Sequence, residues 1–95
     1  MGKVYENTKN RLHIYSNDGV FRFIATRRAI SESSNGMTYY YGSQWYIETH
    51  RRNGTGFERY IFHGLKYVVS NKKAIYDLLS KSVQFSKAYA ELTGK

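Results

Sequence analysis

The spacing of apolar residues changes once along this chain, close to residue 70. Before that point, apolar and polar side chains alternate in short runs, which is typical of strands with one buried face. After it, apolar side chains recur at helical spacing, at Ala74, Ile75, Leu78, Leu79, Phe85, Ala88, Tyr89 and Leu92. The two patterns predict a set of strands followed by one amphipathic C-terminal helix over about 71–92.

Helix-capping residues stand at both ends of the predicted helix. Ser70 and Asn71 precede it and Gly94 follows it. An apolar stripe of this length has to be buried, and the sheet is the available partner. With 95 residues, the sequence predicts a single α+β domain over 1–95. The domain would be an antiparallel sheet of four to five strands, within about 3–69 and including two hairpins, with the helix packed on one face.

The first predicted hairpin joins two alternating runs, 11–16 and 20–27. Between them, Ser16-Asn17-Asp18-Gly19 has the composition of a tight turn. The segment that follows, 27–36, is polar and mostly without period, so we expect a loop there. A short apolar run at 65–69 predicts a further strand.

The second predicted hairpin turns at Asn53-Gly54, a dipeptide typical of two-residue turns. Placing these two residues at the centre of the turn fixes the expected register, which pairs His50 with Phe57, Glu48 with Arg59, Tyr46 with Ile61, and Trp45 with Phe62. One face of the hairpin is then apolar, with Trp45, Ile47, Tyr60 and Phe62. The other face is mixed in character.

The mixed face is the predicted binding surface, because the helix can cover only one side of the sheet. It would carry Tyr46, His50, Phe57 and Arg59, with Arg51 and Arg52 beside it. Aromatic rings on an open sheet can stack on bases, and guanidinium groups pair with phosphates. This combination favours a small non-enzymatic domain that binds nucleic acid, DNA or RNA.

Charge and tyrosine content support the same interpretation. Lys and Arg number 15 against 7 Asp and Glu, a net charge of +8, and there are 10 tyrosines. A positive field of this size attracts polyanions. Lys72 and Lys73 lie in the first turn of the predicted helix, where a bound phosphate would offset their repulsion by the helix dipole; otherwise they are simply solvated.

Three other functions use the same residues. The hairpin tip at 51–55 could enter a groove of a duplex. The Tyr/Arg patch could instead bind protein, either as a homodimer seam or in a small phage-type or mobile-element-type accessory protein that inhibits a host protein handling nucleic acid. A metal-independent ribonuclease could draw on His50, Glu48, and Arg51 or Arg59.

Several classes of protein are excluded by what the sequence lacks. Without cysteine there is neither a disulfide scaffold nor a thiolate zinc site. No apolar run approaches the roughly 20 residues that cross a bilayer, and there is no signal-peptide pattern at the N-terminus. We therefore expect a cytoplasmic protein with no membrane association, metal or cofactor.

Overall fold

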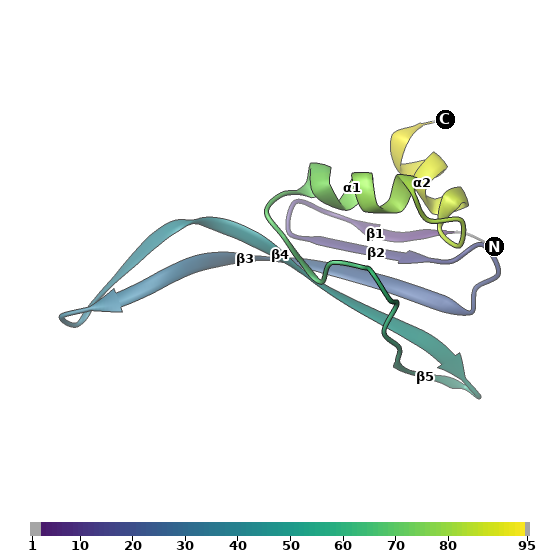
Figure 1. The fold of residues 1–95 in the computed structure, drawn as a ribbon, viewed down its shortest axis with the longest axis horizontal. Coiled ribbons are helices and arrows are strands. Elements are labelled where there is room, and N and C mark those ends of the chain that lie inside the picture. Colours follow the sequence, from purple (N-terminus) through teal and green to yellow (C-terminus); the bar gives the residue numbers. More distant parts are fainter. Residues whose placement is uncertain (1–2, 95) are drawn as a thin grey trace.

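The protein is an α+β domain in which one antiparallel sheet carries two short helices (Figure 1). The computed structural model describes residues 3–94. Its elements are β1 (Val4–Asn7), β2 (Arg11–Tyr15), β3 (Phe21–Ser34), β4 (Met37–Asn53), β5 (Gly56–Arg59), β6 (Val68–Val69), α1 (Lys72–Ser80) and α2 (Ser86–Thr93). Strands β1 to β5 lie side by side in chain order, and β6 also pairs with β4. The predicted α+β class is confirmed.

One face of the sheet forms the core with both helices. The alternating residues of β2, β3 and β4 that point to this side are buried, and each helix adds its apolar stripe. The cluster consists of Leu12, Ile14, Phe23, Ala25, Trp45, Ile47, Val69, Ile75, Leu79, Phe85 and Ala88. Because both helices pack here, the opposite face of the sheet has no covering element among the described residues.

The helical segment predicted over 71–92 is confirmed in part: it forms two helices rather than one, because the chain leaves the helix between α1 and α2. Asn71 caps α1 as predicted, with its Oδ1 accepting a hydrogen bond from the Ala74 N–H at 2.9 Å. Gly94 ends α2 with a left-handed φ of 73°. The apolar spacing continues across the break because both helices bury residues in the same core, so the pattern alone did not reveal two helices.

The loop predicted over 27–36 is wrong. Residues 27–34 continue β3 and pair with β4 as far as Ser34 opposite Met37. Asn35 and Gly36 form the two-residue turn, with positive φ of 53° and 75°. The segment lacks a period of two because it packs on no third element, so neither of its faces needs apolar side chains.

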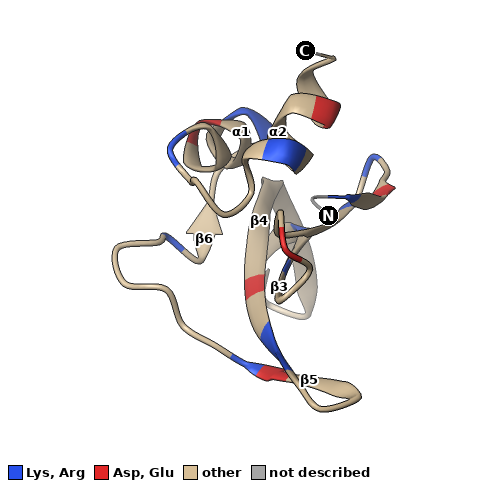
Figure 2. Ribbon diagram, turned by 90° about the vertical axis from the view of Figure 1, so that its right-hand side faces the viewer, with Lys and Arg blue, Asp and Glu red and all other residues tan. Residues whose placement is uncertain are grey.

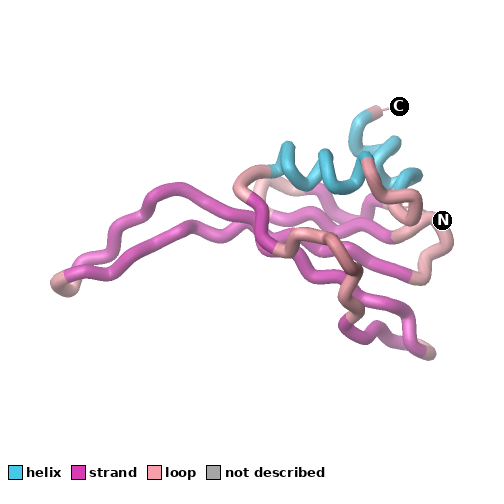
Figure 3. The backbone as a smooth tube through the Cα atoms, in the orientation of Figure 1, coloured by secondary structure: helices cyan, strands magenta, loops and turns pink. Residues whose placement is uncertain are grey.

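We call residues 27–44 the arm. This part of the β3–β4 hairpin extends beyond β2 and β6, whose last paired positions on it are Thr26 and Trp45 (Figure 3). The arm accounts for the elongated dimensions of 50 × 32 × 24 Å. Nearly all of its side chains are exposed.

The hairpin between β4 and β5 has a register two residues away from the predicted one. Asn53 pairs with Gly56 and His50 pairs with Arg59, so Gly54 and Thr55 form the turn. Gly54 has a φ of 62° at the first central position, which type II′ turns reserve for glycine. The predicted partners of Glu48, Tyr46 and Trp45 are therefore wrong: Tyr46 pairs with Val68, and Trp45 with Val69. A shift of two keeps every side chain on its predicted face.

The remaining strand predictions are confirmed only in part. The first hairpin forms as expected, with β2 and β3 joined by the turn at residues 16–19. Of the predicted strand at 65–69, only Val68–Val69 is extended and paired. Strand β1 adds an edge next to β2, which raises the number of strands above the predicted four to five.

Candidate functional site

The uncovered face of the sheet gathers aromatic and basic side chains from all five consecutive strands. We call it the open face. The register aligns Tyr15, Arg22, His50 and Arg59 as direct cross-strand neighbours on β2, β3, β4 and β5. Strand alternation adds Arg28 and Tyr46 further along the same side. The face therefore exists because the helices occupy the other side.

A row of aromatic rings crosses the open face from β1 to β5. The ring centroids of Tyr5 and His13 are 4.8 Å apart, those of His13 and Tyr15 are 5.1 Å apart, and those of Tyr15 and Phe57 are 6.1 Å apart. These separations lie within the range of favourable aromatic contacts. Tyr5 is 66% exposed, whereas His13 is buried beneath its neighbours. Tyr5 is thus available to a ligand, whereas Tyr15 and Phe57 are half-buried.

Arginine side chains lie against these rings. The guanidinium carbon of Arg22 is 4.3 Å from the Phe57 ring centroid, and that of Arg52 is 5.2 Å from it. Arg28 lies 5.8 Å from the centroid of Tyr46. Cation–π contacts of this kind restrict a guanidinium group while leaving its edges free to donate hydrogen bonds. The open face consequently presents oriented cations among its rings.

The two histidines of the open face both have lowered pKa values, which favours their neutral forms. Burial lowers the pKa of His50 below its ordinary value of 6.5, and the Arg22 guanidinium lowers that pKa further, against a smaller opposing effect of Glu48. Burial and then Arg22 likewise lower the pKa of His13. The Arg22 Nε–H donates to His50 Nδ1 at 3.1 Å, which fixes the ring. The Nε2 atom of His13 is buried without a hydrogen-bond partner.

The hypothetical ribonuclease site has an unsuitable geometry around His50. One ring nitrogen accepts from Arg22, and the other lies 3.6 Å from the Glu48 carboxylate. Only 14% of the His50 side chain is exposed. A general base must reach the proton that it removes, and here both nitrogens already face protein groups. The arrangement suits a side chain that organises its neighbours.

Five of the eight predicted site residues lie on the open face, namely Tyr46, His50, Arg52, Phe57 and Arg59. Arg51 projects from the opposite side of β4, where it pairs with Glu58 at 3.3 Å and lies 5.5 Å from the Tyr60 ring centroid. The two adjacent arginines of the predicted site, Arg51 and Arg52, therefore lie on opposite faces of the sheet.

Lys72 and Lys73 belong to α1, on the helix side of the sheet. The Lys72 ammonium donates to Asn7 Oδ1 and to the Thr8 carbonyl oxygen, and it lies 5.8 Å from the Trp45 ring centroid. These contacts tie the start of α1 to the β1–β2 turn. Lys73 is exposed. The structure brings neither lysine to the open face.

Six aromatic or basic residues of the open face were absent from the predicted site: Tyr5, Arg11, His13, Tyr15, Arg22 and Arg28. Alternation in β2 and β3 marks the polar side of each strand in the sequence. To know that the polar sides of β2 and β3 face the same way as Tyr46, one needs the registers of the β2–β3 and β3–β4 pairs. The tight turn at residues 16–19 supplied the first of these registers, but the unrecognised arm concealed the second.

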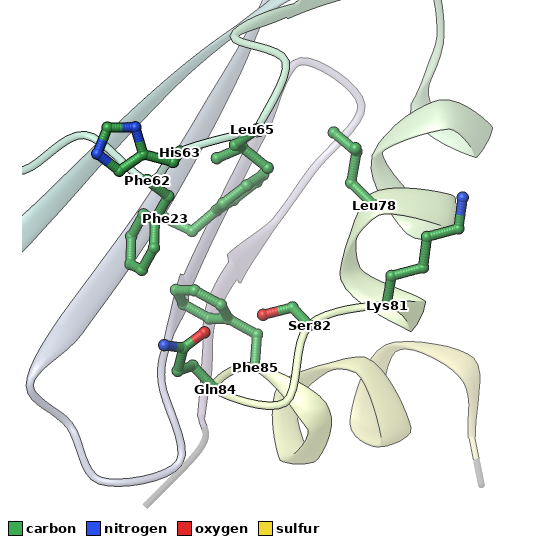
Figure 4. Close-up of a pocket in the computed structure, with 10 residues that line it drawn as sticks. Phe23, Phe62, His63, Leu65, Leu78, Lys81, Ser82, Gln84 and Phe85 are labelled. Atoms are coloured by element: carbon green, nitrogen blue, oxygen red, sulfur yellow. The ribbon is translucent and has the colours of Figure 1, made fainter.

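A separate pocket lies on the helix side, between the chain after β5 and the α1–α2 connection (Figure 4). It has a volume of about 260 Å³, with Phe23, Phe62 and Phe85 among its lining residues. Lys81 and His63 also border it. None of the predicted site residues lines this pocket, so it is distinct from the open face.

Searches of the chain against protein-family models, curated proteins and solved structures find no match. Neither described helix has the length and apolar character needed to cross a membrane.

Proposed function

We propose that this protein binds single-stranded nucleic acid on the open face, without catalysing a reaction on it. The observation that supports this most strongly is the row of rings from Tyr5 to Phe57 with Arg22 and Arg52 against Phe57. Base stacking on exposed rings contributes about 1–3 kcal/mol per base and tolerates any sequence. Tyr5, Tyr15 and Tyr46 are the proposed stacking residues, along with Phe57.

The charges on the open face favour a polyanion. Arg11, Arg22, Arg28, Arg52 and Arg59 project there, and the nearby acidic residues are Glu6 and Glu48. Glu6 is paired with Arg11 at 3.1 Å, and Glu48 lies beside His50. Of the remaining arginines, Arg22 is bonded to His50, and we assign Arg52 and Arg59 to phosphates. A nucleic-acid ligand also fits the cytoplasmic location expected from the sequence.

Binding is tested by fluorescence anisotropy with a labelled oligothymidylate or oligouridylate of about 10 nucleotides, titrated at several salt concentrations. Two phosphate contacts predict a slope of about −1.4 for the logarithm of the association constant against the logarithm of salt concentration. Arg52→Gln should flatten this slope by roughly 0.7. Arg51→Gln is the matched control, because it removes a neighbouring arginine from the opposite face.

Three results would contradict the proposal. The first is no binding at about 50 mM salt, which would favour the rival function as a small inhibitor of a nucleic-acid-handling protein through the same patch. The second is tighter binding to duplex than to single strands, which would favour groove entry by the β4–β5 hairpin. The third is an equal loss of affinity in Arg51→Gln and Arg52→Gln, which would move the contact away from the open face.

A further inference from the structure

The outer backbone edge of β3 is unpaired along the arm. Strand β2 covers this edge only as far as Thr26, and the Arg27 N–H donates to the Asn10 carbonyl oxygen at 2.9 Å. Backbone groups alternate in direction along a strand, so Ala29, Ser31 and Ser33 face the same side as Arg27. No described strand pairs with them there. An exposed edge of this kind is a template for another strand.

The arm has a second outer edge, on β4, but that edge is irregular. The register shifts between Ile30 and Ser31, because Ile30 pairs with Gly42 and Ser31 pairs with Tyr40. Tyr41 is therefore an extra residue on β4, and Gly42 has a φ of 148°. Bulges bend a strand and interrupt its ladder, which protects an edge from pairing. The edge of β3 has no such interruption.

The arm also lacks the charges that usually protect exposed edges. Residues 29–44 contain one charged side chain, Glu32, so none of the 15 Lys and Arg residues lies in this part of the arm. Figure 2 shows Lys and Arg on the helices and on the β4–β5 end of the body. Lysine and proline are the common means of blocking an edge, and this edge has neither. The near-neutral arm is consequently the part of the molecule best able to meet a second copy.

We propose that two copies of this chain dimerise by antiparallel pairing of their β3 edges, centred on Ile30. In this register Ile30 lies opposite Ile30 of the second copy, and Arg28 lies opposite Glu32 of the second copy. The two-fold symmetry forms that ion pair twice, which is the self-complementarity that an isologous interface needs. The incoming strand takes the place along β3 that β2 leaves free after Thr26. The proposal is independent of nucleic-acid binding.

Antiparallel pairing of the arms also limits the repulsion between two copies of a protein with net charge +8. Each positively charged body lies at the far end of the partner's arm. Pairing across residues 28–32 leaves the two Thr26 residues about eight strand positions apart, which is about 26 Å at roughly 3.3 Å per residue and more than three times the Debye length of about 8 Å at physiological salt. A dimer seam on the open face would instead bring its arginines together. The arm therefore permits association at little electrostatic cost.

Sedimentation velocity over about 1–200 µM measures the association, and the proposal expects a monomer–dimer equilibrium for the natural chain. Arg28→Glu and Glu32→Arg should each raise the dimer dissociation constant roughly tenfold or more, because each places like charges opposite one another twice. The double variant Arg28→Glu/Glu32→Arg should restore dimerisation, because the exchanged charges attract again. Arg27→Glu is the matched control: it makes the same change of charge on the other face of the arm and should leave the dissociation constant within about threefold.

Ala29→Pro provides a second measurement that does not depend on charge. Its N–H faces the free edge, so proline there spares the β3–β4 ladder and blocks an incoming strand. We expect a monomer with an unchanged circular dichroism spectrum. A natural chain that is monomeric at 200 µM would overturn the proposal, as would a dimer that survives Ala29→Pro or a charge exchange that fails to restore a dimer lost in both single variants.

Discussion

Asn17 joins two parts of the chain that are about 70 residues apart. It belongs to the β2–β3 turn, yet its Nδ2 donates to the Val83 carbonyl oxygen and its Oδ1 accepts from the Lys87 N–H, each at 2.9 Å. Phe85, the residue at the N-cap of α2, makes no side-chain capping bond. A turn residue therefore caps α2 from outside the helix and holds the break between the two helices.

We predict that Asn17→Ala lowers the free energy of unfolding by about 1–2 kcal/mol, the usual cost of losing a cap together with a neighbouring hydrogen bond. Urea denaturation measures this change. Asn17→Asp keeps the acceptor for the Lys87 N–H and should lose less than half as much. Equal losses in the two variants would show that the capping bond is not what holds α2 in place.

The lowered pKa values of His13 and His50 make stability depend on pH. The unfolded histidines bind protons near pH 6.5, whereas the folded ones do so only at lower pH. The unfolded state therefore binds more protons in this window, and the free energy of unfolding decreases as pH falls from about 7 through the folded pKa values. Urea denaturation at pH 7.5, 6.5 and 5.5 should show the decrease, and His13→Gln/His50→Gln should flatten it. A natural chain equally stable at all three values would contradict this prediction.

At the scale of the elements, the two Asn-Gly dipeptides show that this sequence predicts a turn but not its exact position. Asn35-Gly36 occupies the central positions of its turn, whereas Asn53 remains in β4 and Gly54 begins the next turn. The predicted and observed registers of the second hairpin differ by two residues and place the same side chains on the same faces. The face pattern therefore predicted the open face correctly but could not select the register.

Burial also determined which elements could be predicted from the sequence. The β2–β3 hairpin and α1 each bury one side, so their period and caps are visible in the sequence. Strand period in the arm is absent because neither side of it is buried. The break before Phe85 was concealed because residues on both sides of it pack into one core, and the residue that stabilises the break is Asn17 rather than a local one.

The arm should be removable without unfolding the body, because no residue of the buried core lies in it. We predict that replacing residues 29–43 with Asn-Gly, which joins the paired residues Arg28 and Gln44 by a two-residue turn, shifts the melting temperature by only a few degrees. Circular dichroism melting measures this shift. Loss of the cooperative transition would mean that the arm stabilises the body through contacts along β3 and β4.

For the whole molecule, the proposed dimer determines where the two open faces lie relative to each other. The two-fold axis of an antiparallel strand pair is perpendicular to the sheet, so both open faces of the proposed dimer lie on the same side of one continuous sheet. A single strand long enough to span the two bodies can then contact both. Linking two sites in this way converts the second binding step into an intramolecular one and can raise affinity by a factor of 10² or more.

We therefore predict that a single strand of about 40 nucleotides binds the natural chain at least tenfold more tightly than one of about 10 nucleotides, at protein concentrations where the dimer forms. Anisotropy titrations of both lengths measure the ratio. Ala29→Pro should bind the short strand as the natural chain does, because its open face is unchanged, and should reduce the ratio to the few-fold advantage that comes from overlapping sites alone. An equal ratio in Ala29→Pro and in a dimeric natural chain would mean that the two open faces do not lie on one side of the sheet. The pairing of the β3 edges would then have to be rejected, even if the protein still binds nucleic acid.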